Sequence, residues 1–423
     1  MIRLAGNGTF AALGTPNYRR YFTGQAISLI GTWMQTVGQA WLVLQLTGSG
    51  TGLGLIMAAQ FLPVLALAPY GGLLVDRADK RKLLVATQTA LGLLALALGI
   101  LTVSGLVELW MVVVLAVLLG VVNAVDTPGR QAFALEMVGR DQLRNAVTLN
   151  SLLVNGARAV GPAVAGGLIA TIGLGACFLV NAASYIAVLA ALSGMDRGSL
   201  LPSAPAERAR GQVRAGLRYV RRTGGLLVPL LMVGLIGTLA FEFSVVLPVL
   251  AQRTFDGGAG TYALLTSAIG AGAIVGGLVT AGRRGTGVRS LTRAALAFSL
   301  TLGLAALAPT LPVAVAALML VGATSITFLA TGNSTIQLTA EPAFRGRVMA
   351  LWAVAFLGST PVGGPIVGVV ADTLTPRGGL ALGAVACLAA AGIGAIALAK
   401  GVRADGDPPS DRRPAVPARS RPA

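Results

Sequence analysis

Two charged residues, Arg158 and Glu242, lie inside long apolar stretches of this 423-residue chain. A carboxyl group among apolar side chains favours its neutral form, so it can take up and release a proton. Glu242 is therefore the first candidate for a proton-carrying residue, and Asp126, at the end of another apolar stretch, is the second. Two alternatives stay open for Glu242: contact with water, or permanent pairing with Arg158, which would keep the carboxylate charged.

Arg158 points to a cavity because a charge within an apolar stretch must face polar surroundings or a partner. Ser151, Asn155 and Arg158 are spaced by four and three residues, which places them on one face of a helix. Gly161 and Pro162 follow and predict a bend. The alternative is a structural arginine bonded to backbone carbonyls at the proline break.

Polar residues at helical spacing extend this predicted cavity to other stretches. Gln35 and Gln39 belong to such a stripe in residues 22–46, and Thr327 belongs to one in residues 312–333. Stripes of this kind also form hydrogen bonds between helices, and that reading stays open. The predicted cavity residues are Gln35, Gln39, Asn155, Arg158, Glu242 and Thr327.

The residue inventory excludes several other chemistries. The chain has no histidine and two cysteines, Cys177 and Cys387, which lie in apolar stretches without a CxxC pattern. Histidine-ligated metals and Ser-His-Asp catalysis are thereby excluded. No GxxxxGK[ST] motif for nucleotide binding occurs, which argues against an ATP-driven pump. We expect no enzyme activity, no metal and no cofactor.

The elements that must position these residues are membrane-spanning helices. Hydrophobic residues make up 55% of the chain and charged residues 11%. Apolar stretches of about 20 residues recur, each long enough to cross a bilayer. We predict an all-α membrane protein with twelve transmembrane helices, at residues 22–46, 52–75, 83–103, 107–126, 146–171, 174–194, 226–250, 261–281, 291–309, 312–333, 348–370 and 379–399.

The basic residues predict the orientation of these helices. The chain has 32 Lys and Arg against 15 Asp and Glu, a net charge of +17. If both termini lie on one side, 29 basic residues fall on that side, Arg253 and Arg377 fall on the other, and Arg158 lies within a span. Cytoplasmic loops carry such an excess. We therefore expect a multi-pass protein of the cytoplasmic membrane with both termini cytoplasmic, and no nucleic-acid partner.

The chain divides near its middle. Residues 195–225 form a basic central loop between residues 22–194 and 226–399, and residues 1–21 and 400–423 flank them. Gly161-Pro162 recurs as Gly364-Pro365, which indicates two related six-helix halves with substrate between them. Residues 207–222 predict a surface helix, and the Pro- and Arg-rich tail predicts disorder.

The loop between the second and third stretches carries a family signature. It reads Gly72-Leu-Leu-Val-Asp76-Arg77-Ala-Asp79-Lys80-Arg81-Lys82 and resembles that of the major facilitator superfamily, except that Asp79 replaces a glycine. In that family the loop latches the inner gate, which implies gating roles for Gly72, Asp76, Arg77 and Arg81. The alternative is a plain basic cytoplasmic loop.

Further motifs resemble the exporter branch of this superfamily, which includes enterobactin exporters and macrolide-efflux proteins. They are Gln39–Gly50, Asp126-Thr-Pro-Gly-Arg130, Asn145–Ser151, Ala157–Pro162 and Arg345-Gly-Arg-Val-Met. Gly161 and Pro162 are similar to the antiporter signature of the fifth span. Asp126 and Arg130, four residues apart, can pair on one helical face, and we predict a gating network there. The alternative is a plain, solvated helix end.

The resemblance implies a secondary active transporter. We expect a proton-coupled antiporter that exports an amphipathic small molecule, such as a drug, macrolide or siderophore, by alternating access. Its expected partners are the substrate, the proton and the lipid bilayer, and a monomer is expected. The alternatives are uptake of a small nutrient, or a non-transporting membrane sensor that has kept the fold.

Overall fold

The computed structural model describes residues 10–201, 212–281, 285–342 and 344–402, and this part of the chain is helical without strands. A short 3-10 helix, Ala11–Gly14, precedes a first group of helices: α1 (Pro16–Thr47), α2 (Gly50–Arg77), α3 (Lys80–Val103), α4 (Leu109–Thr171) and α5 (Leu174–Ser193). The connecting helix is α6 (Gln212–Arg222). The second group is α7 (Gly224–Ala240), α8 (Phe243–Arg253), α9 (Ala259–Ala281), α10 (Val288–Ala306), α11 (Leu311–Thr339), α12 (Arg345–Leu357), α13 (Thr360–Thr373) and α14 (Pro376–Ala399).

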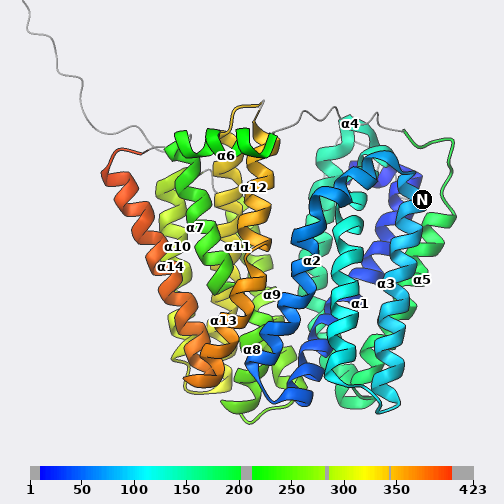
Figure 1. Ribbon diagram of the computed structural model, residues 1–423, viewed down its shortest axis with the longest axis horizontal. Helices are drawn as coiled ribbons and strands as arrows, with labels where there is room; N and C mark the ends of the chain where they lie inside the picture. Colours follow the sequence, from blue (N-terminus) through cyan, green and yellow to red (C-terminus); the bar gives the residue numbers. More distant parts are fainter. Residues whose placement is uncertain (1–9, 202–211, 282–284, 343, 403–423) are drawn as a thin grey trace, which may run out of the picture.

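The two groups lie side by side, with α6 across one end of the second group (Figure 1). We call this the α6 end; it also carries the α2–α3 turn. The opposite end, with the α1–α2 and α8–α9 turns, is the α8 end. The groups diverge towards the α6 end and approach each other at the α8 end (Figure 1), where α2 packs on α13 and α4 packs on α9.

The helices agree with the predicted spans. Nine helical segments in the described residues are long and apolar enough to cross a membrane, with α7–α8 and α12–α13 each counted as one. The long α4 covers the fourth and fifth predicted stretches, and α1 and α10 cover the first and ninth. All twelve predicted stretches therefore coincide with helices, and the all-α membrane fold is confirmed.

One connection differs from the expected alternation of span and loop. The chain between the fourth and fifth stretches is helical, and α4 runs for 63 residues with a single non-helical position at Gly139 (φ 70°). Glycine tolerates this conformation because it has no Cβ. The bend lets one helical segment leave the first group at the α6 end and return into it.

Two predicted spans are each broken within the second group. The seventh is interrupted at Phe241 and Glu242, and the eleventh between α12 and α13, where Pro361 occupies the first turn of α13. The rings of Phe241 and Phe356 lie 5.1 Å apart, so the two breaks adjoin. Non-helical backbone at membrane depth is tolerated where it is buried in protein or lines a water-filled cavity.

Side chains fix the helix ends at the turns. Gly48 adopts the left-handed conformation (φ 62°) that ends α1, and the Ser49 hydroxyl accepts the Gly52 N–H to cap α2. Asp79 caps α3 by accepting the Lys82 N–H at 3.0 Å. Asp79 thus provides a helix cap at the position where the family signature has glycine.

The central loop is described only in its second part. Residues 202–211 lie outside the described residues, and the predicted surface helix is observed as α6. The ring of Tyr219 stacks on Phe344 with centroids 4.4 Å apart, which docks α6 on the start of α12. Of the tail predicted to be disordered, residues 403–423 lie outside the described part.

Candidate functional site: a cavity and two charged ends

A cavity of about 240 Å³ lies along the first group and is completed by Ser244 of α8. Its wall includes Gln35 and Gln39, as predicted from their spacing, beside apolar residues such as Trp33 and Ile56. Four further amide side chains complete its polar part: Gln60, Gln88, Asn123 and Asn181. An apolar wall with a few amide groups is typical of small-molecule sites.

Hydrogen bonds orient part of this wall. The Asn181 side-chain amide donates to Oε1 of Gln35 at 2.6 Å, and the Ser184 hydroxyl donates to the Asn181 backbone carbonyl at 2.7 Å. Gly31 of α1 lies against the Asn181 side chain, where a larger residue would collide. The position of Gln35 is therefore set by α5, and its amide nitrogen is not used in this bond.

An ion pair lies where the cavity approaches the α6 end. Asp126 is fully buried and meets Arg130 Nε at 2.8 Å, as the four-residue spacing predicts. Thr87 and Gln88 of α3 donate to its other oxygen at 2.7 and 2.8 Å. Arg130 also donates to Gln25 of α1 at 3.2 Å. This cluster joins α1, α3 and α4 and places Arg130 on the cavity wall.

Arg158 contacts Trp33, which belongs to the same wall. Its guanidinium lies over the ring of Trp33, 5.2 Å from the centroid, in a cation–π contact. Gly161 lies against the Trp33 Cβ and the Ile30 carbonyl, so the Gly161-Pro162 segment brings α4 close to α1. The Asn155 amide donates back to the Ser151 carbonyl of its own helix at 2.8 Å.

Glu242 occupies the break between α7 and α8. It is 4% exposed, hydrogen-bonds the Thr360 side chain, and lies against Gly363 of α13. A small space around it is lined by apolar residues of the second group, including Val246 and Leu380. Among the described residues no ion pair joins Glu242 to Arg158, so the alternative of a permanent pair does not hold in this conformation.

Four residues predicted to line the substrate cavity lie outside its described wall: Asn155, Arg158, Glu242 and Thr327. The reasons differ. Arg158 lies over the ring of Trp33, which itself belongs to the wall, and Glu242, at the α7–α8 break, lines a separate small space in the second group. Thr327 forms a 2.8 Å hydrogen bond with Thr280, which is the helix-to-helix role left open for polar stripes.

The predicted gate loop lies at the α6 end. Arg81 donates to the carbonyls of Leu192 (2.6 Å) and Ser193 (3.0 Å) at the C-terminal end of α5, where a cation is favourable. Gly72 and Asp76 are half-buried on α2, and Arg77 at its end is exposed. The contacts of Arg81 therefore lie within the first group.

A buried ion pair beside this loop was not predicted. Lys80 Nζ meets Glu136 Oε1 at 2.8 Å, and the two side chains are 9% and 10% exposed. The pair joins α3 to α4 just before the bend at Gly139. Lys80 was assigned to a basic loop, and neither its burial nor its partner 56 positions away is visible in a local pattern.

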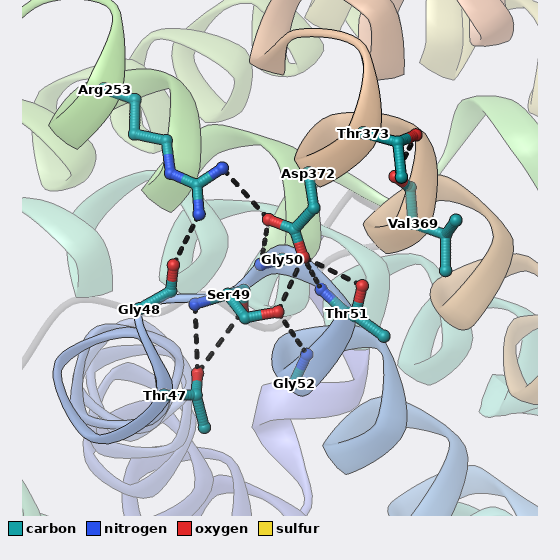
Figure 2. A network of polar contacts seen from close by, with 10 residues as sticks. All are labelled: Thr47, Gly48, Ser49, Gly50, Thr51, Gly52, Arg253, Val369, Asp372 and Thr373. Atoms are coloured by element: carbon teal, nitrogen blue, oxygen red, sulfur yellow. Dashed lines mark hydrogen bonds and ion pairs between the residues drawn. The ribbon is translucent and has the colours of Figure 1, made fainter.

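The α8 end carries a polar network that sequence reasoning missed (Figure 2). Asp372, one residue before the end of α13, accepts the backbone N–H groups of Gly50 and Thr51 at 2.9 and 2.8 Å. The Ser49 and Thr51 hydroxyls donate to it at 2.6 and 2.8 Å. Arg253 at the end of α8 meets it at 3.1 Å.

One sequence signal could have revealed this network. The segment Gly368-Val-Val-Ala-Asp372 repeats the Gly-x-x-x-Asp pattern of Gly72-Leu-Leu-Val-Asp76. Arg253 was already one of the two basic residues placed on the side opposite the termini. Together they indicate an acidic and a basic group at the end where charges are few.

The fold and cavity define a class: a multi-pass helical membrane protein whose cavity adjoins the contact between two helix groups. The chain belongs to the transmembrane secretion effector family of the major facilitator superfamily, whose sequence profile matches residues 7–417. The resemblance drawn from the motifs is thereby confirmed.

Curated relatives support the exporter branch. The chain is 27% identical over 262 residues to the staphyloferrin A transporter of Staphylococcus aureus, covering 61% of this chain and 65% of that protein. It is 23% identical over 261 residues to macrolide efflux protein A of Streptococcus pyogenes, covering 61% and 64%. It is 25% identical over 365 residues to the enterobactin exporter EntS of Shigella flexneri, covering 85% and 86%. The first two matches span just under two thirds of those relatives.

Solved structures share the fold. A bacterial homologue of the human lysosomal transporter Spinster, in an inward-facing and occupied conformation, has a TM-score of 0.70 at 14% identity, covering 93% of this chain and 98% of that one. A POT family transporter in complex with a thioalcohol-conjugated peptide has a TM-score of 0.72 at 11% identity, covering 91% and 96%. At these identities the likeness establishes the fold alone.

Proposed function

We propose that the protein is a proton-coupled antiporter that exports an amphipathic small molecule across the cytoplasmic membrane by alternating access. The α6 end, with its basic turns, would face the cytoplasm. The two helix groups would act as halves that rock around the cavity, in a monomer. The names of two relatives, macrolide efflux protein A and enterobactin exporter EntS, support the outward direction.

The cavity supports an amphipathic substrate. Its apolar side chains, among them Trp33 and Phe61, offer surface to a hydrophobic body, while the amides of Gln39 and Gln60 both donate and accept hydrogen bonds. The wall of described residues has no carboxylate, and its one basic side chain, Arg130, is bound to Asp126. Such a wall suits varied, weakly polar molecules better than a small, strongly charged nutrient.

The position of Glu242 is the observation that carries the proposed proton coupling. The residue is buried at a break in the helix, and its described contacts are a threonine and glycine backbone rather than a cation. A proton can therefore be gained or lost there without breaking an ion pair. Because Glu242 lies where the α7–α8 and α12–α13 breaks adjoin, its charge state can affect the packing at both helix breaks of the second group.

Asp126, the second proton candidate, has different surroundings. It is held by Arg130 at one carboxylate oxygen and by Thr87 and Gln88 at the other, so both oxygens already take part in one cluster. We therefore assign proton exchange to Glu242 and a gating and structural role to the Asp126–Arg130 pair. The guanidinium that this pair keeps on the cavity wall would rearrange when the α6 end closes.

The proposal can be tested with ethidium and erythromycin as probes in inside-out vesicles that contain the full chain. An imposed pH gradient, acidic inside, should drive probe uptake into these vesicles, which corresponds to export from the cell. Glu242→Gln should abolish the gradient-driven component while retaining probe binding. Glu108→Gln, an exposed residue that bonds Trp110, is the matched control and should transport normally.

Other outcomes decide between the remaining functions. Unchanged pH dependence in Glu242→Gln would contradict the proton role. Movement of a nutrient probe in the opposite direction would indicate uptake. No movement of any probe, in a protein that folds and inserts normally, would favour a non-transporting sensor.

A further inference from the structure

We propose that Asp372 and Arg253 act as the latch of the α8 end: their contacts hold the two helix groups together in the present conformation and must break in each transport cycle. This inference rests on the alternating-access part of the proposed function. It does not depend on the substrate or on proton coupling. Asp372 and Arg253 are positioning residues, because they set the conformation without contacting the transported molecule.

Each charged residue of the latch meets the helix end of opposite partial charge at the α1–α2 turn. Asp372, from the second group, receives the first backbone N–H groups of α2, where an anion is favourable. Arg253, also from the second group, donates to the carbonyl of Gly48 at the C-terminal end of α1, where a cation is favourable. Figure 2 shows both charged side chains directed at this one turn.

Next to the latch, α2 and α13 contact each other through glycines; we call this contact the seam. Gly50 of α2 lies against the Gly368 carbonyl of α13, and one turn further Gly54 lies against the Gly364 carbonyl. Glycine pairs allow the two backbones to approach closely. Van der Waals contact favours closure along this seam, and among the described residues the hydrogen bonds given between α2 and α13 are those of Asp372.

The latch is also built to open. The side chains of Arg253 and Asp372 are 37% and 19% exposed, so water can replace their partners when the helices separate. The Lys80–Glu136 pair, at 9% and 10%, has no such access and joins helices of one group. Partial exposure therefore distinguishes a contact that can exchange from one that is permanent.

The test uses a cysteine that is hidden behind the latch. Val43 is fully buried and lines the cavity towards the α8 end. We would introduce Val43→Cys into a chain in which the buried Cys177 and Cys387 are replaced by serine. The rate of labelling by a membrane-impermeant maleimide, added from the α8 side without substrate or gradient, then reports how often this end opens.

Removing the charge of the latch should open this end. Asp372→Asn should raise the labelling rate about tenfold, because the amide cannot receive all of its donors. Arg253→Gln should raise it by about threefold, as expected for a partly exposed pair. The matched control is Asp256→Asn, an exposed residue at the same end whose left-handed backbone (φ 46°) asparagine tolerates. An unchanged rate in Asp372→Asn and Arg253→Gln would overturn the proposal.

A second measurement keeps the test decisive if Asp372→Asn folds poorly. Ser49→Cys and Asp372→Cys together place thiols at two positions whose native side-chain oxygens are in hydrogen-bond contact at 2.6 Å. Oxidation should lock the α8 end, stop labelling of Val43→Cys and stop probe transport, and reduction should restore both. Full transport by the cross-linked protein would overturn the latch. Loss of probe transport in every variant, with labelling still dependent on Asp372, would count against the proposed function alone.

Discussion

The two ends of the molecule use their charged residues differently. At the α8 end, Asp372 and Arg253 belong to the second helix group and bind the α1–α2 turn of the first. At the α6 end, the Lys80–Glu136 pair and the carbonyl contacts of Arg81 join helices of the first group to one another. The same kinds of bond thus connect the groups at one end and brace a single group at the other.

From this difference we infer that the structure shows the conformation in which the α8 end is closed. Contacts between the two groups hold the α8 end closed. The bonds within the first group at the α6 end keep that group rigid in either orientation of the two groups. A rigid body with a releasable contact is what a rocking mechanism requires. We therefore expect substitutions at the α6 end to change stability, and substitutions at the α8 end to change conformation.

The largest expected effect on stability is that of Lys80→Met. It removes the cation that meets the buried Glu136 carboxylate at 2.8 Å, which should lower the free energy of unfolding by about 3–5 kcal/mol. Denaturant titration in mixed micelles measures this change. Lys82→Met, at an exposed neighbouring lysine, is the control and should change stability little. A loss of stability as small as that of Lys82→Met would contradict the assignment of the Lys80–Glu136 pair as a stabilising contact of the α6 end.

Asp126→Asn should have a somewhat smaller effect. The Arg130 side chain is 30% exposed, so water can partly compensate the lost carboxylate, and we expect a loss of about 3 kcal/mol. The same titration measures it, with the exposed Asp141→Asn as control. Labelling of Val43→Cys from the α8 side should stay unchanged; a large increase would show that the α6-end cluster also controls the α8 end.

Arg81→Ala removes two hydrogen bonds to the end of α5. Because these bonds are partly exposed, we expect a loss of about 1 kcal/mol in the free energy of unfolding. The exposed Arg140→Ala is the control. If Arg81 acts only as a brace, transport per folded molecule should stay normal. A strong fall in transport without loss of stability would instead favour the gating role that the family resemblance implies.

Arg253→Gln should affect stability least, by less than about 1 kcal/mol, since exposed ion pairs contribute little. Its effect should appear in the labelling rate of the α8 end, as described above. A change in stability larger than that of Arg81→Ala would mean that Arg253 is structural. That result would remove the distinction between the two ends.

Much of the fold follows from local properties of the sequence. The lengths of the apolar stretches predict the helices, and the four-residue spacing of Asp126 and Arg130 predicts their ion pair. Gln35 and Gln39 line the cavity because helical spacing places them on one face. These features depend on neighbours within one helix, which a single sequence records.

The remaining features depend on contacts between distant segments. Ser49 and Asp372 are 323 positions apart, and only packing of α2 on α13 brings them together. The position of Glu242 outside the cavity depends on a helix break at which Phe241 of α7–α8 packs on Phe356 and Gly363 of α13 lies against Thr238. The helical link within α4 depends on Gly139, one glycine among 57 in the chain.

Distances between spin labels at both ends test the central claim most directly. Leu46 and Leu374 are exposed residues of the two groups near the α8 end, and Val147 and Leu338 are exposed residues of the two groups near the α6 end. Pulsed electron paramagnetic resonance would measure each pair with and without Asp372→Asn. Alternating access predicts that the substitution lengthens the first distance and shortens the second. Two distances that change in the same direction, or do not change, would contradict it.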